Sequence, residues 1–111
     1  MLYLDYLIYE GIEMQLPFNT DLPILNWRKI GHIYVVIFDY MTFPKAKPAR
    51  NMIAFTEDGK EIWRTEAYTK LATDGWVNFI SIEPLIVGNF SGYNATIDLG
   101  TGVVLATEFT K

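Results

Sequence analysis

Short runs of apolar and β-branched residues, separated by turn signals, recur along the whole chain. Residues 33–38 form a continuous apolar run that is too short for a helix and predicts a central strand. Residues 93–98 instead alternate between apolar and polar positions, which indicates a strand with one buried face. No segment sustains the apolar spacing of a helix, although residues 68–75 are compatible with either a short helical turn or a loop.

The pattern predicts an antiparallel meander of about nine short strands in a single all-β domain over residues 1–111. We expect propeller-blade-like sheets, a bent sandwich or a partial barrel. The segments with strand character are residues 2–9, 12–16, 24–30, 33–38, 51–56, 61–67, 77–82, 85–90, 93–98 and 103–110.

The clearest hairpin signal is Asp58-Gly59, which lies between two apolar stretches. Gly59 is therefore expected to adopt a positive φ angle. The longest irregular stretch is residues 40–50, where Pro44 and Pro48 cannot donate to a sheet and three basic residues favour solvent. We interpret that stretch as an exposed loop.

An internal repeat links two parts of the chain at an offset of 43 residues. Residues 51–62 align without gaps with residues 94–105, and each copy consists of a strand, a turn ending in Gly, and a second strand. An apolar strand precedes each copy at a different distance. The repeat therefore predicts two blade-like units, residues 33–67 and 77–110.

This repeat resembles the blade repeat of quinoprotein-type (PQQ-like) β-propellers over about half the chain. In that family a strand ends in Asp, two residues and Thr-Gly, and a Trp follows four residues after the Gly. Asp98, Thr101 and Gly102 match the turn, whereas Gly59 and Trp63 match the Gly-to-Trp spacing. The resemblance implies that Trp63 is buried between neighbouring sheets. A closed propeller needs about four to eight blades, so no cofactor is carried over and we expect none.

Composition narrows the classes of function. The chain has no cysteine, which excludes disulfides and thiolate chemistry. Its net charge of −4 argues against binding to nucleic acid or to anionic membranes. No apolar run is long enough for a spanning helix, and the first eight residues do not have the pattern of a secretory signal. We therefore expect a cytoplasmic protein.

Candidate catalytic residues are few and dispersed. The single histidine, His32, follows Gly31 at a strand break, and neither Ser81 nor Ser91 lies in a nucleophile elbow. Asp58, Asp74 and Asp98 each lie close to a glycine, as turn-forming residues do. The sequence predicts no catalytic residue and no metal site, and an acid/base hydrolase is the weakest reading.

Aromatic residues are abundant and favour a binding function. Trp76 follows Asp74-Gly75, and Tyr93 follows Ser91-Gly92, so both are candidate surface aromatics and ligand-binding residues. We predict a non-enzymatic interaction module for a protein or peptide partner. The alternative is a carbohydrate- or small-ligand-binding domain that stacks its ligand on exposed aromatic rings.

The two terminal strands decide the expected assembly. Residues 103–110 are apolar at alternate positions and contain one charge, Glu108. If residues 2–9 pair with them, the sheet closes within the monomer. Otherwise an exposed edge strand invites a second chain. The sequence slightly favours the second alternative, a homodimer.

Overall fold

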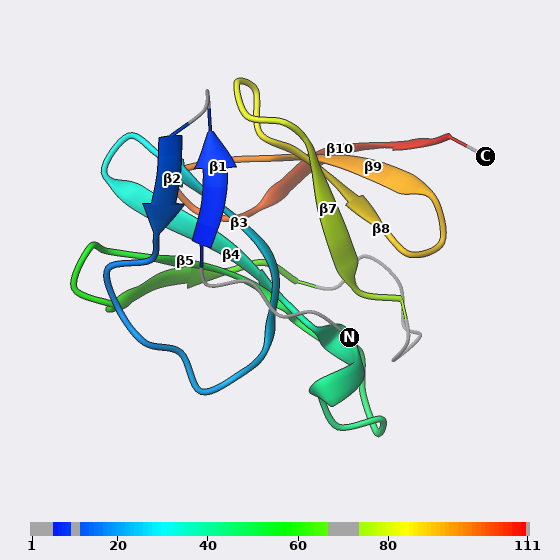
Figure 1. The fold of residues 1–111 in the computed structure, drawn as a ribbon. Coiled ribbons are helices and arrows are strands. Elements are labelled where there is room, and N and C mark those ends of the chain that lie inside the picture. Colours follow the sequence, from blue (N-terminus) through cyan, green and yellow to red (C-terminus); the bar gives the residue numbers. More distant parts are fainter. Residues whose placement is uncertain (1–5, 10–11, 67–73, 111) are drawn as a thin grey trace.

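The computed structural model describes residues 6–9, 12–66 and 74–110, and in these residues the chain is all-β (Figure 1). The described residues form ten strands and one short 3-10 helix, η1 (Tyr40–Thr42). The strands are β1 (Tyr6–Tyr9), β2 (Ile12–Gln15), β3 (Ile24–Ile30), β4 (Ile33–Phe38), β5 (Met52–Phe55), β6 (Glu61–Arg64), β7 (Trp76–Ser81), β8 (Ile86–Asn89), β9 (Tyr93–Ile97) and β10 (Val104–Phe109). Nine of these ten strands fall within a segment predicted from the sequence, and β7 begins at Trp76, one residue before its predicted segment 77–82.

The strands form two four-stranded antiparallel sheets and a separate hairpin. The first sheet has the order β3-β4-β5-β6 and the second has the order β10-β9-β8-β7, while β1 pairs with β2. The two sheets lie across one another, with β7 against β3 and β4 (Figure 1). This arrangement is the predicted bent sandwich. The first sheet also includes β3, which precedes the predicted unit 33–67, whereas β7–β10 span nearly all of the predicted unit 77–110.

Strand β4 is buried on both faces, which explains its continuous apolar run. Val35 and Ile37 belong to the core between the two sheets. Val36 and Phe38 belong to a second core, which Leu16 and its neighbours in the chain cover from the other side. The first sheet is therefore the middle layer of the molecule.

A single side chain joins the two sheets where β5 begins. Asn51 is fully buried, and its Nδ2 donates to the carbonyl oxygens of Phe38 and Trp76, both at 2.7 Å. Its Oδ1 accepts a hydrogen bond from the backbone N–H of Trp76 at 2.9 Å. The amide thus pairs with the backbone of β7 as a neighbouring strand would, and it fixes the start of β7 against the first sheet.

The turn between β9 and β10 has the expected chemistry. The Asp98 carboxylate accepts hydrogen bonds from the Gly100 N–H at 3.2 Å and the Thr101 hydroxyl at 2.7 Å. Gly102 has φ +77°, and a Cβ placed there would lie 2.5 Å from the Trp63 ring. Trp63 is 7% exposed and donates from its indole nitrogen to the Leu99 carbonyl at 2.8 Å. Its predicted burial between the sheets is confirmed, and the close approach requires glycine at position 102.

The stretch 40–50 is only partly the exposed loop that the sequence predicted. Tyr40 and Ala49 are buried, and Asp39 caps η1 by accepting a hydrogen bond from the Met41 N–H at 3.0 Å. The residues between them are mostly exposed. The buried ends return the chain to the first sheet, so the intervening segment is anchored at both sides.

The predictions for residues 2–5 and 67–73 lie outside the described residues. Asp74 and Gly75, which end the ambiguous segment, are buried and directly precede β7. In the described part of the chain β1 pairs with β2, and β10 pairs only with β9. The described residues therefore do not show the closed monomer in which the two terminal strands pair. Their one helix, η1, is far too short to cross a membrane.

Replacing Gly59 should destabilise the β5–β6 hairpin. Gly59 has φ +85°, which confirms the predicted turn, and a Cβ placed there would lie 3.0 Å from the Phe18 Cβ. Gly59→Ala should cost about 1 kcal/mol or more of the free energy of unfolding, measured in urea. Gly31→Ala is the matched control, because Gly31 has φ +61° and open space around it. Equal losses in the two variants would show that the Phe18 contact contributes nothing.

Trp63→Ala should lower the free energy of unfolding by about 3–5 kcal/mol, since it empties the space between the sheets. Trp63→Phe retains most of the apolar ring and loses the hydrogen bond to Leu99, so its loss should be clearly smaller. Urea denaturation of both variants provides the comparison. A loss under about 1 kcal/mol for Trp63→Ala is incompatible with a buried indole at this position.

Asn51→Ala should be among the most destabilising polar substitutions, because it leaves three buried backbone groups of Phe38 and Trp76 without their partner. We expect a loss of about 3 kcal/mol or more in thermal or urea unfolding. Asn78→Ala, at an exposed position of β7, should change stability by no more than about 0.5 kcal/mol. Similar losses in both variants would refute the role of Asn51 in joining the sheets.

Candidate interaction surface

The structure places Trp76 in the core. Its side chain is 1% exposed and packs between the sheets, so the prediction of a surface aromatic at this position is wrong. The turn residues Asp74 and Gly75 suggested a loop edge, but both are buried because Asn51 draws the start of β7 against the first sheet. A buried indole offers no face on which a ligand can stack.

Tyr93, the second predicted binding residue, lies half-buried at the start of β9. Its ring is 4.9 Å from the ring of Phe109, measured between centroids, with 50° between the ring planes. Phe109 ends β10 directly opposite Tyr93 and is 55% exposed. The structure therefore pairs one predicted aromatic with a second that the sequence analysis did not select.

The hairpin that carries Tyr93 is fixed by side-chain hydrogen bonds. The buried Asp74 carboxylate accepts from the Ser91 N–H at 2.8 Å and from its hydroxyl at 2.9 Å. The Asn89 side-chain oxygen accepts from the Tyr93 N–H at 2.9 Å. The prediction that Asp74 forms its own turn with Gly75 is wrong: both residues are buried, and the Asp74 side chain instead stabilises the β8–β9 turn, which is distant in sequence. Ser91 serves the same turn.

Next to this turn, Phe90 is 60% exposed, with its ring 6.0 Å from that of Tyr40. Burial, together with the nearby Asp39 and Asp74 carboxylates, raises the pKa of Tyr40. The Tyr40 hydroxyl therefore stays protonated at neutral pH. The rings of Phe90 and Tyr40 at this end of the second sheet are therefore both uncharged.

Among strands β3 to β10, strand β10 is the most exposed. It forms the edge of the second sheet, and five of its six residues are exposed. Leu105 is 63% exposed and Phe109 is 55% exposed, while Glu108 is the one charged residue of the strand. The register shifts between Val104 and Ala106, so Leu105 lies at a β-bulge. A large apolar area is thus presented along an edge.

A shallow groove of ≈ 200 Å³ runs along the outer face of the same sheet, beside β10. In the strand register, Glu108 lies opposite Asn94, and Ala106 lies opposite Thr96. Gly88 leaves room for the Asn78 side chain, since a Cβ there would lie 2.5 Å from the Asn78 Oδ1. The groove is lined by Ile80, Ile86, Asn94, Thr96, Ala106, Thr107 and Glu108. It combines aliphatic walls with polar groups and one carboxylate.

The other candidate residues do not converge. His32 is exposed in the turn between β3 and β4, which agrees with its predicted turn position. Among the described residues, no group of three or more histidine, cysteine, aspartate or glutamate side chains is placed to bind a metal ion. The Asp58 carboxylate bonds to Thr56 within its own turn, and this bond is the main reason that the pKa of Asp58 is lowered.

Sequence reasoning missed Leu105 and Phe109 as surface residues, although a signal was present. The sequence predicted that residues 103–110 form a strand that either pairs with residues 2–9 or remains an exposed edge, and it did not decide between the two. Only the strand order shows that β10 has a neighbour on one side and extends past the core. The edge position, rather than the residue types, makes this strand a candidate interaction surface.

Comparison with known proteins assigns the chain to a family without describing an activity. No curated protein matches the sequence. One family model, described as "Domain of unknown function (DUF7957)", matches residues 13–109 and thus covers most of the chain, including every strand from β3 to β10. The chain therefore belongs to the family of the domain of unknown function DUF7957.

Proposed function

We propose that this chain is a non-enzymatic interaction module that binds an extended segment of a protein partner along the outer edge of β10. The observation that carries the proposal is the edge position of β10, with Leu105 and Phe109 both more than half exposed. An edge strand adds a further strand readily, because its outward backbone groups form the hydrogen bonds of a sheet.

The other sheet edges are less suited to strand addition. Strand β6 is short and carries Glu61 and Arg64 at its ends, and its centre includes the buried Trp63. Strand β7 lies against β3, so these two edges meet each other. Charged side chains and covering elements are the usual means by which edges avoid pairing. Strand β10 has neither a proline nor a charge other than Glu108.

The groove beside β10 would supply side-chain specificity. In a strand added to β10, alternate side chains lie over the outer face, next to Ala106 and Glu108. The carboxylate of Glu108 favours a lysine or arginine in the partner strand, and the aliphatic walls favour an apolar neighbour. The preferred partner segment is therefore extended, alternately apolar, and basic at one position.

A carbohydrate-binding function receives less support. Its motivation was a pair of exposed aromatic rings, but the rings of Tyr93 and Phe109 are inclined by 50° and do not form one flat platform. Trp76, the other predicted stacking residue, is buried. We also propose that the protein and its partner are cytoplasmic, because the net charge of −4 and the lack of cysteine suit that compartment.

Selection from a displayed library of peptides about 12 residues long tests the proposal, because strand addition reads mainly the backbone. Selected peptides should be apolar at alternate positions with a basic residue, and binding should slow amide hydrogen exchange in residues 105–109. The double variant Leu105→Lys/Phe109→Lys should weaken binding by about tenfold or more. Val103→Lys is the matched control, because Val103 is 56% exposed but precedes the strand.

The same variants test whether the partner is a second copy of this chain. If light scattering at micromolar concentration shows a dimer, the double variant should be monomeric and Val103→Lys should remain dimeric. Selected peptides that bind the double variant as well as the parent protein would contradict the proposal. So would a dimer that all of these variants retain, combined with unchanged exchange in β10.

A further inference from the structure

A second surface, which shares no residue with the β10 surface, lies where residues 43–50 return to the first sheet. A groove of ≈ 170 Å³ is lined there by Phe43, Pro44, Lys47, Pro48, Arg50 and Arg64. Its position is fixed because Ala49 and Asn51, on either side of Arg50, are buried. Arg64 ends β6. The groove therefore joins an anchored loop to a strand end.

Positive charge is concentrated in this groove. Three of the nine basic residues of the chain line it, and Lys45 lies in the same loop. Residues 40–50 contain no acidic residue, although the whole chain carries a net charge of −4. The remaining lining residues are an aromatic ring and two prolines. The groove thus offers both cationic and apolar side chains to a ligand.

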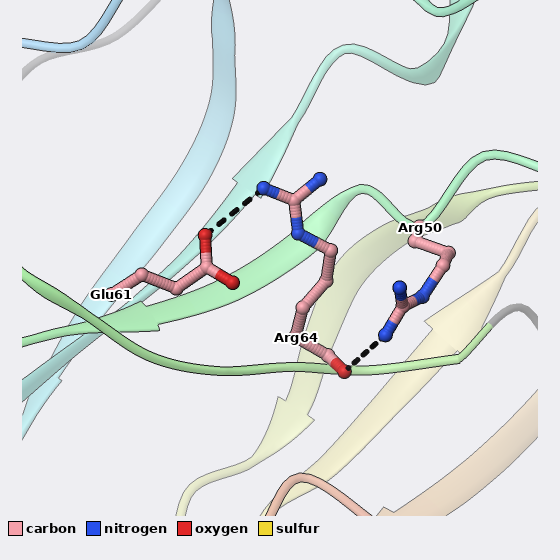
Figure 2. A network of polar contacts seen from close by, with 3 residues as sticks. All are labelled: Arg50, Glu61 and Arg64. Carbon is pink, nitrogen blue, oxygen red and sulfur yellow. Dashed lines mark hydrogen bonds and ion pairs between the residues drawn. The ribbon is translucent and has the colours of Figure 1, made fainter.

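Glutamates of the chain already contact both arginines. Figure 2 shows the pair of Arg64 with Glu61 and the bond from Arg50 to the Arg64 carbonyl oxygen. The Arg64 guanidinium lies 3.0 Å from a Glu61 carboxylate oxygen. Arg50 lies 2.9 Å from a Glu66 carboxylate oxygen, and it donates to the Arg64 carbonyl oxygen at 3.2 Å. In each ion pair one guanidinium nitrogen contacts one carboxylate oxygen, whereas a guanidinium has five N–H donors.

These internal ion pairs are weak enough to be exchanged. The Arg50 and Glu66 side chains are 45% and 76% exposed, and exposed pairs of this kind contribute little to stability. A partner carboxylate that enters the groove would meet Lys47 as well as a guanidinium. The partner carboxylate would therefore contact two cationic side chains, whereas each internal glutamate contacts one arginine.

The size of the groove indicates what kind of ligand it accepts. Sites for small molecules usually enclose about 300–1,000 Å³, so a volume of ≈ 170 Å³ corresponds to one side chain rather than a metabolite. We propose that this groove binds a glutamate or aspartate side chain in an acidic segment of a protein partner, with an apolar neighbour of that residue against Phe43. The partner carboxylate would replace Glu61 or Glu66 on the arginines.

Titration with the capped peptide Glu-Glu-Phe-Glu-Glu, followed by backbone amide NMR shifts, tests this inference. The shifts should concentrate at residues 43–50 and 61–66 and should weaken as salt is raised, because exposed charges are screened. The capped peptide Gln-Gln-Phe-Gln-Gln should bind at least about tenfold more weakly, since it lacks the charge-assisted bonds. Shifts that are equal for both peptides, or spread over the whole molecule, would overturn the proposal.

Matched variants separate the groove from general charge attraction. Arg64→Gln should weaken binding of the acidic peptide by about tenfold. Lys29→Gln, which removes the same charge from an exposed position of β3, should change it by less than about twofold. Equal effects of these two substitutions would show non-specific attraction and refute the site.

Glu61→Gln provides a test that misfolding cannot imitate, because it should strengthen binding. Removing the internal carboxylate leaves Arg64 available to the peptide, so affinity should rise several-fold at unchanged thermal stability. Glu57→Gln is the control, since Glu57 is exposed in the β5–β6 turn and lies outside the groove lining. An unchanged or lower affinity for Glu61→Gln would contradict the proposed exchange.

Discussion

The arrangement of the two sheets depends on the side chain of Asn51. A buried amide is costly unless its donors and acceptor are satisfied. Here Nδ2 donates twice, and Oδ1 accepts the N–H of Trp76, so the amide is paired on both sides. The bonds join the end of β4 and the start of β7, which lie far apart in the sequence. Because their geometry is directional, they define the approach of the sheets more closely than apolar packing alone.

The position of β7 decides which strand of the second sheet is covered. Fixing β7 against β3 and β4 places one edge of the second sheet at the interface, and the strands then proceed away from it in the order β7, β8, β9, β10. Val87 of β8 and Ala95 of β9 still contribute to the core. By β10 only Val104 packs against that core, and the residues after it are exposed. The exposed edge is thus a geometric consequence of the interface.

Local patterns were sufficient to predict the strands, because alternation, β-branched runs and Asp-Gly turns are properties of neighbouring residues. The turn at Gly59 followed from such a pattern, whereas the burial of Trp63 was implied by the resemblance of the repeat to propeller blades. Trp76 could not be placed in this way. Its neighbours Asp74 and Gly75 resemble a surface turn, but they are buried by bonds to Ser91 and by the packing of Gly75 against Tyr40. Both contacts join residues distant in sequence.

The pair of Tyr93 and Phe109 also shows that local sequence patterns do not determine which residues are exposed. The sequence analysis did not select Phe109, and its exposure depends on the order of strands in the sheet. Likewise, residues 43–50 looked like an ordinary basic loop. These residues lie close to Arg64 only because β5 pairs with β6, which brings the end of β6 beside Asn51 and its neighbours. The residue types of β10 and of the basic loop were visible in the sequence, but the residues that lie beside them are determined by the order of the strands.

The two proposed surfaces use different physical terms, and this difference allows them to act independently. Strand addition at β10 draws on backbone hydrogen bonds and apolar contact, so it depends weakly on salt. The groove at Arg50 and Arg64 draws on charge, and it is screened within about 8–10 Å at physiological ionic strength. Glu108 on the first surface favours a basic segment, whereas the groove favours an acidic one. One extended partner with separated charges could therefore engage each surface in only one orientation, since the reverse orientation would place like charges together.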